Sequence, residues 1–194
     1  MLRRMCLTAG CLVAVFSHRP ARAEVLDTTA SRPSGAFSIA GEIEGMSRGD
    51  SLMLSVHEAV GLAGGVDLIA RQGFGLTDNK SVYFGGGLKW TLLHDKPSAP
   101  GLAVWAGGHY WTGPVVAGFD ATILLDHHFG RFTPYAGLDL NLEFSSGNSF
   151  LGLAVLGGGR IGLGSHIAWY VEGGLGLGGA GKFNFISTGP RFQI

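Results

Sequence analysis

The sequence predicts an all-β protein, a closed, antiparallel, up-and-down transmembrane β-barrel of about ten strands. Three observations carry this prediction. Apolar and polar residues alternate over successive runs of roughly 8 to 14 residues, which is the period of a β-strand. Glycine accounts for 34 of the 194 residues, against a usual share of about 7%. Only 14% of the residues are charged, against a usual value of about 25%, so water alone does not explain the surface composition.

The alternating runs define the strands. In residues 135–144 the odd-numbered positions, which include Asp139 and Glu143, are polar or small, whereas the even-numbered positions are apolar. Turn residues such as Ser47-Arg48-Gly49-Asp50 separate one run from the next. Ten strands are expected, and eight remain an alternative if the first two pair poorly. The expected ranges are 36–44, 51–59, 64–75, 81–93, 101–112, 115–126, 134–145, 149–163, 166–178 and 182–193.

The start of the chain has the features of a cleaved signal peptide. Arg3 and Arg4 precede a mostly apolar stretch, and Ala21-Arg22-Ala23 resembles a cleavage site. Processing as a lipoprotein at Cys11 is the alternative. The expected organisation is a signal peptide over 1–23, a flexible lead-in over 24–35 and a barrel domain over 36–194.

Removal of the signal changes both the thiol content and the charge. Cys6 and Cys11 lie inside it, so the mature chain has no disulfide and no thiolate metal site, and we expect no cofactor. Four of the 14 basic residues are also removed, which leaves ten against 14 acidic residues and a net charge of −4. This charge argues against nucleic acid as a partner.

The period of two does not say whether the apolar faces meet a protein core or lipid. Lipid is favoured because the polar faces contain little Lys or Glu and because the strands are long enough for a tilted span, which needs roughly 9 to 11 residues. Aromatic residues also recur near strand ends, as in the girdles of membrane barrels. The alternative is a soluble, exported, lipocalin-like barrel that binds an apolar ligand. The aromatic residues are Trp90, Trp111, Phe119, Phe129, Phe132, Tyr135, Phe144, Phe150, Trp169, Tyr170, Phe183 and Phe185.

The polar faces would line the lumen with charges of both signs. A barrel of eight to ten strands has an interior about wide enough for side chains to fill. One reading is a network of carboxylates around Arg71, Lys89 and Arg160 that plugs the tube, and the other is a narrow water-filled pore, for which inward glycines leave room. The predicted polar network consists of Glu42, Asp67, Arg71, Lys89, His109, Asp120, Asp139, Glu143, Arg160 and Glu172, with Glu44 and His57 nearby.

Two short motifs raise the question of catalysis. Ser165 and His166 are adjacent on an extended chain and point to opposite faces, so they cannot simply form a nucleophile and base pair. Asp126 and His128 share a face and would need a third ligand to hold a metal. A polar turn near the headgroups explains both motifs, and we expect no catalytic residue and no metal site. A lipid-modifying membrane enzyme remains a third hypothesis.

The segment Arg131-Phe132-Thr133-Pro134-Tyr135-Ala136-Gly137, the alternation and the last strand resemble small bacterial outer-membrane barrels of the OmpA-domain and OmpW type, over residues 36–194. The resemblance implies a porin-like or structural protein of the Gram-negative cell envelope, in contact with outer-membrane lipids and handled by periplasmic chaperones and the barrel-assembly machinery. Ile194 departs from the aromatic residue that commonly ends such chains, and Pro190 removes a hydrogen-bond donor from the last strand. An even strand number places both termini on the periplasmic side.

Overall fold

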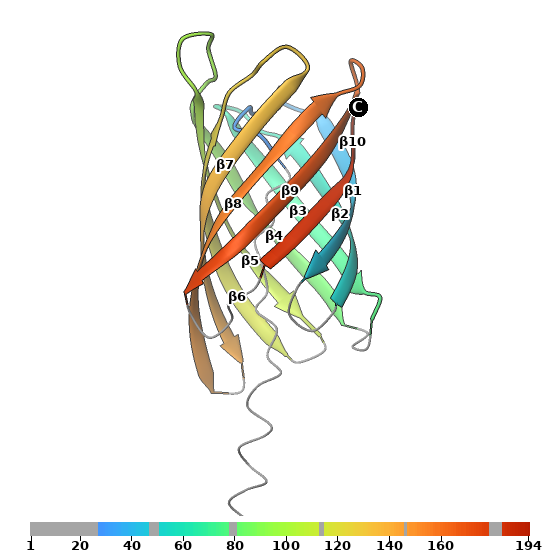
Figure 1. Ribbon diagram of the computed structural model, residues 1–194, viewed down its shortest axis with the longest axis vertical. Helices are drawn as coiled ribbons and strands as arrows, with labels where there is room; N and C mark the ends of the chain where they lie inside the picture. Colours follow the sequence, from blue (N-terminus) through green and yellow to red (C-terminus); the bar gives the residue numbers. More distant parts are fainter. Residues whose placement is uncertain (1–26, 47–50, 78–80, 113–114, 146, 179–183) are drawn as a thin grey trace, which may run out of the picture.

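The computed structural model describes residues 27–46, 51–77, 81–112, 115–145, 147–178 and 184–194. In this part of the chain ten antiparallel strands form one closed barrel (Figure 1). No helix among the described residues is long and apolar enough to cross a membrane. The strands are β1 (Phe37–Met46), β2 (Ser51–Gly61), β3 (Val66–Gly75), β4 (Val82–Leu93), β5 (Gly101–Trp111), β6 (Val116–Asp126), β7 (Phe132–Ser145), β8 (Asn148–Gly162), β9 (Ile167–Gly178) and β10 (Asn184–Gln193).

Consecutive strands are neighbours in the wall, and the pairing of β1 with β10 closes the ring. Closure removes the two unpaired edges that an open sheet of this size would expose. The backbone amides of Phe37 and Ile194 donate to each other's carbonyl oxygens at 3.3 and 2.9 Å. The two ends of the barrel sequence therefore meet, and we call this end of the barrel the termini end and the opposite one the far end.

The architecture confirms the predicted fold class. All ten predicted strands have a counterpart, and their limits agree with the sequence prediction to within two residues. The last strand also forms despite Pro190, which lies opposite Trp169 of β9 near the end of β10. Local alternation was sufficient to locate the strands because each strand pairs with its neighbour in sequence.

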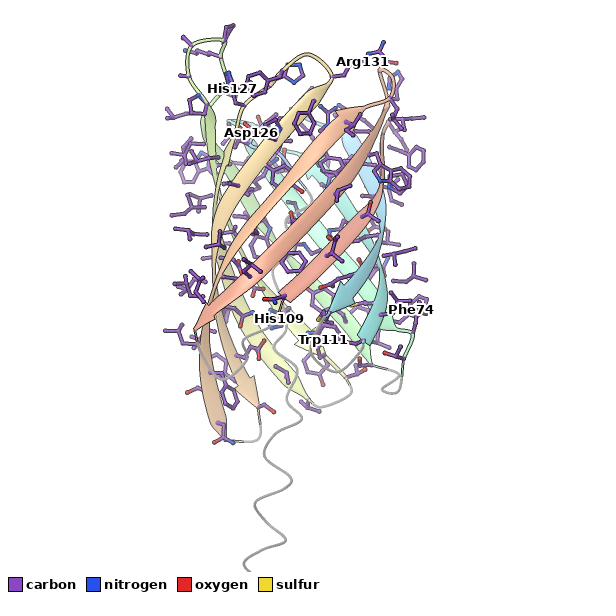
Figure 2. All side chains as sticks on the ribbon, in the orientation of Figure 1. Phe74, His109, Trp111, Asp126, His127 and Arg131 are labelled. Atoms are coloured by element: carbon purple, nitrogen blue, oxygen red, sulfur yellow. The ribbon has the colours of Figure 1, made fainter. Side chains whose placement is uncertain are left out.

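The outside of the barrel is apolar. Every strand directs large apolar side chains outward, and the strand register places them side by side. Leu138 of β7, for example, pairs with Ile123 of β6 and Val155 of β8, and all three are exposed. Figure 2 shows side chains projecting all around the wall. Soluble monomers rarely expose an apolar patch of more than a few hundred Å².

The aromatic residues are divided between the two faces, which corrects the expectation that all of them form girdles. Exposed on the outside are Trp90, Phe119, Phe129, Phe132, Phe144 and Trp169. Buried inside are Trp111, Tyr135, Tyr170 and Phe185, while Phe150 is half-buried and Phe183 lies outside the described residues. The buried aromatic residues lie on the same strand faces as the polar residues. Tyr135, for example, shares a face of β7 with Asp139.

Glycines make room for these inner rings. A Cβ on Gly158 of β8 would lie 2.5 Å from Cζ of Tyr135 and 2.5 Å from the carbonyl oxygen of Val171. Gly174 of β9 lies against the ring of Phe185 in the same way. The glycine-rich stretches 157–159 and 173–178 are therefore parts of strands β8 and β9, in which Gly158 and Gly174 leave space for aromatic rings inside the lumen.

We expect Gly158→Ala to lower the free energy of unfolding by about 1–3 kcal/mol, because the added methyl group overlaps both a ring and a backbone oxygen. Gly152→Ala on the same inner face of β8 is the matched control, since the nearest atom to its new Cβ would be Asn141 Cβ at 3.8 Å. Urea titrations followed by tryptophan fluorescence measure the difference. Equal midpoints for the two variants would show that the inner rings relax without cost.

Candidate functional site

The lumen is the candidate functional site, because the charged side chains of the strands point into it, with the exception of Glu58 in β2, which is half-buried on the opposite face from His57. Nine of the ten residues of the predicted polar network are buried there, and Arg160 is half-buried. The structure does not join them into one network. It distributes them over a cluster at the termini end and smaller groups deeper in the lumen. The nine buried residues are Glu42, Asp67, Arg71, Lys89, His109, Asp120, Asp139, Glu143 and Glu172.

The cluster at the termini end is built around residues 27–35, which we call the luminal segment. This segment forms no strand, and its first residues are buried, with Asp27 4% and Thr29 0% exposed. Residues 24–35 were expected to be a flexible lead-in. Residues 24–26 lie outside the described residues. Of the others, residues 27–29 are buried inside the barrel and residues 33–35 are exposed, and the segment contacts β3, β4, β6 and β10. These contacts have a physical reason, since the polar side chains of the segment complement charges on the inner wall. The flexibility of the lead-in stays a prediction.

Asp27 is bound by three cations. Its carboxylate lies 3.0 Å from Lys89 Nζ, 3.2 Å from Arg32 Nη2 and 2.8 Å from Arg191 Nη1. Burial raises the pKa of this carboxyl, but the charges of Arg191, Arg32 and Lys89 outweigh burial and hold the pKa well below its usual range. A carboxylate with a lowered pKa stabilises the fold above its unfolded pKa, and this contribution is lost only as the pH falls through the folded value. The contacts of Asp27 therefore persist from neutral pH to below about 3.9, the usual pKa of aspartate.

Lys89 and Asp67 extend the cluster from the wall. Lys89 Nζ donates to the carbonyl oxygens of Thr28 and Ala30 at 2.9 and 2.7 Å and lies 3.0 Å from Asp67 Oδ2. Asp67 also accepts hydrogen bonds from the backbone N–H of Arg32 at 2.9 Å and from its Nη1 at 2.7 Å. Both wall residues are fully buried. Each of these buried charges thus has an opposite charge beside it. Removing an unpaired ion from water would cost several kcal/mol, on the order of its desolvation energy.

Thr29 attaches the luminal segment to β6 and, a second time, to β4. Its backbone N–H and its hydroxyl donate to the two carboxylate oxygens of Asp126 at 2.7 and 2.6 Å. Thr91 of β4 donates its hydroxyl to the Thr29 carbonyl oxygen at 2.5 Å. The segment is therefore held from both β4 and β6, which leaves less of the lumen free at the termini end.

Two smaller groups lie deeper in the lumen. Glu42 of β1 lies 2.7 Å from His57 Nε2 of β2 and accepts a hydrogen bond from the Ser55 hydroxyl at 3.1 Å. Asp120 of β6 lies 2.6 Å from His109 Nδ1 of β5. A hydrogen bond of 2.7 Å from Asn141 Nδ2 also reaches Asp120. In both groups the partners come from adjacent strands, so the strand register alone brings them together.

The surroundings of Arg71 and Arg160 differ from the prediction that carboxylates lie around both side chains. The guanidinium of Arg71 lies over the ring of Trp105, 4.5 Å from its centroid, and its cross-strand neighbours are His57 and Gly85. Among the described residues, neither Arg71 nor Arg160 forms an ion pair with a carboxylate. Of the three cations, Lys89 alone is ion-paired within this described part of the chain.

Sequence reasoning missed four residues of the termini-end cluster: Asp27, Thr29, Arg32 and Arg191. Arg191 lies an even number of positions from Phe185 and Ser187, which face inward in β10. The alternation of the last strand would therefore have placed the Arg191 side chain in the lumen. The other three residues precede the first strand, where no period indicates a direction. A short polar stretch with charges of both signs was the available signal.

The side chains of Asp126, His127 and His128 do not meet at one site. The Asp126 carboxylate faces Thr29, whereas His127 Nδ1 lies 2.7 Å from Asp95 Oδ1 and His128 Nδ1 lies 2.9 Å from the Thr133 hydroxyl. Figure 2 shows Asp126 and His127 at the termini end. No group of three His, Cys, Asp or Glu side chains suited to a metal ion occurs among the described residues.

Ser165 and His166 lie in the turn between β8 and β9 and are exposed. They line the rim of a cavity at the termini end together with Arg160 and Arg191. This polar turn therefore lines the same cavity as residues of the luminal segment.

Comparison of the sequence with models of known protein families and with curated proteins finds no match. Solved structures to which the chain is similar include two bacterial barrels and one designed barrel. The KdgM porin is 14% identical over 80% of this chain and 98% of its own, with a TM-score of 0.44. The translocator domain of the autotransporter NalP from Neisseria meningitidis is 13% identical over 84% and 90%, with a TM-score of 0.42. A de novo designed transmembrane β-barrel is 10% identical over 84% and 99%, with a TM-score of 0.44. Similarities this low carry no information on substrate or activity.

Proposed function

We propose that this chain is an integral β-barrel of a bacterial outer membrane with a passive, non-catalytic role, as a structural barrel or as a small pore whose resting state is closed by the luminal segment. The observation that carries the proposal is the inversion of the usual distribution of polarity. Apolar side chains cover the outside of all ten strands, and every charged side chain of the strands except Glu58 of β2 has the inward-facing phase, where most are buried. Lipid satisfies such an outer surface.

The soluble alternative requires the opposite arrangement. A lipocalin-like carrier would have an apolar interior and a charged exterior, with room for an apolar ligand. Here Lys89, Asp67 and Glu172 are at most 1% exposed, whereas Phe119 and Leu138 are 65% and 50% exposed. The free energy of transferring such surfaces favours lipid outside, at about 25 cal/mol for each Å² of apolar area removed from water.

The closed state is supported by the contacts of the luminal segment. Buried charges of the wall, Lys89 and Asp67, are paired with Asp27 and Arg32 of this segment. Departure of the segment would leave these wall charges hydrated in an open lumen, so closed and open forms differ by a defined set of ion pairs. We further propose that a signal peptide over 1–23 directs export, that chaperones and the barrel-assembly machinery insert the chain, and that the termini end faces the periplasm.

Membrane fractionation with heat-modifiable gel mobility tests the proposal. We expect the exported chain in the outer-membrane fraction, with different mobility in boiled and unboiled samples, because a closed barrel resists detergent until it is heated. A soluble periplasmic protein expressed in the same cells is the control. Recovery of the chain with that control, and no change of mobility on boiling, would contradict the membrane assignment.

A further inference from the structure

A cavity of about 150 Å³ opens at the termini end, between the luminal segment and the ends of β8, β9 and β10. At about 30 Å³ for each water molecule of the liquid, it has room for roughly five waters or a small solute. Its lining brings together residues that are distant in sequence. Those used below are Asp27, Arg32, Arg160, Ser165, His166 and Arg191.

The lining of this cavity has an excess of positive charge. Three guanidinium groups face one carboxylate, that of Asp27. Arg32 is satisfied by Asp27, Asp67 and the Ser38 hydroxyl, and its side chain is 7% exposed. Arg191 lies 2.8 Å from Asp27 and over the ring of Tyr170. Asp27 is thus already shared between cations and cannot neutralise a third guanidinium.

Arg160 is the third guanidinium. It projects from β8 beside Tyr170 and Thr133, its cross-strand neighbours, neither of which carries a negative charge at neutral pH. Within the described ranges no hydrogen bond or ion pair engages its side chain, which is half-buried at the cavity wall. Ser165 and His166 add hydrogen-bonding groups at the same rim. A half-buried guanidinium with such neighbours is suited to a ligand that supplies negative charge.

We propose that this cavity binds a small oxyanion, a phosphate or carboxylate group, with Arg160 as its principal ligand. The planar guanidinium presents paired N–H donors that match two oxygens of either group. The bound anion would lie between the wall and the luminal segment, so it would also hold this segment in place. The inference does not rest on the proposed membrane function, because the cavity is defined by the barrel and the luminal segment alone.

Isothermal titration calorimetry of the purified, folded protein with inorganic phosphate, and in parallel with acetate, tests the inference. We expect saturable binding of at least one of them and a loss of affinity of about tenfold or more in Arg160→Gln, since a charge-assisted pair is removed. Arg160→Lys keeps the charge without the planar fork and should bind with intermediate affinity. Arg131→Gln removes an exposed arginine of the same barrel end that does not line the cavity, and it should bind like the wild type.

Three results would overturn the inference: no saturable heat with either anion, equal affinity in Arg160→Gln and the wild type, or equal competition by chloride at the same ionic strength. The last result would indicate a general attraction of anions to positive charge. Each variant is also checked for heat-modifiable mobility. Loss of phosphate binding with mobility unchanged therefore separates a failure of this site from a failure of the barrel.

Discussion

Replacing Asp27 by Asn is expected to open the lumen. The substitution removes the carboxylate shared by Lys89, Arg32 and Arg191 and leaves these cations close together. Removing one partner of a buried ion pair costs about 3–5 kcal/mol. A loss of this size in the closed form shifts the equilibrium between the closed and the open lumen by a factor of about 100 or more. Single-channel recordings in planar bilayers should show a closed wild type and a variant that conducts for most of the time.

Asp95→Asn is the matched control for this experiment. Asp95 lies in the turn between β4 and β5 at the same end of the barrel, where it contacts His127 and the backbone N–H of His128 but no residue of the luminal segment among those described. Its substitution should leave conductance at the level of the wild type. Equal conductance of the Asp27→Asn variant and the wild type would contradict the role of the luminal segment in closing the barrel, whatever the absolute value.

Leu138→Arg is expected to impair folding into lipid bilayers severely. Leu138 lies near the middle of β7, is 50% exposed on the outside and is surrounded there by Ile123 and Val155. An arginine on the lipid-facing side at the bilayer midplane costs about 2–4 kcal/mol. Urea titration of the folded protein in lipid vesicles should show this loss as a lower unfolding midpoint, accompanied by a reduced yield of heat-modifiable barrel.

The same substitution at Leu163 is the control. Leu163 directly follows β8 at the termini end and is 59% exposed. Near the membrane interface an arginine costs only about 0–1 kcal/mol. The two variants therefore have the same chemistry and differ in depth. If the chain were a soluble protein, Leu138→Arg would instead improve solubility with little loss of stability, and equal midpoints for both variants would contradict a lipid-facing wall.

The contacts inside the lumen could be predicted only in part from the sequence. His109 and Asp120 were both predicted to face inward, and their contact follows because β5 and β6 are consecutive strands that pair by a hairpin. The orientation of Tyr135 was also contained in the alternation, since it shares a face with Asp139. The expected girdle obscured this, because an aromatic residue near a strand end suits either the membrane interface or a ring packed over an inner glycine.

The contacts of the luminal segment were out of reach for a different reason. Asp27 and Lys89 are separated by 62 positions, and no periodicity connects them. The segment contributes no strand, so nothing in residues 27–35 indicates a direction or a partner. Only after the barrel is closed do Lys89 of β4, Asp126 of β6 and Arg191 of β10 surround one volume that a short polar stretch can enter.

The sequence by itself therefore located the strands and their apolar faces, because a period of two is a property of neighbouring residues and each strand pairs with the next. The pairing of β1 with β2 and β10 decided for ten strands over the alternative of eight. The tertiary structure alone decided which charges neutralise one another. Lys89 is paired with Asp27 and Asp67, whereas Arg71 lies over Trp105 and Arg160 borders a cavity. Charge pairing depends on distances across a closed lumen, and those distances are set by ring closure and strand register rather than by any local pattern.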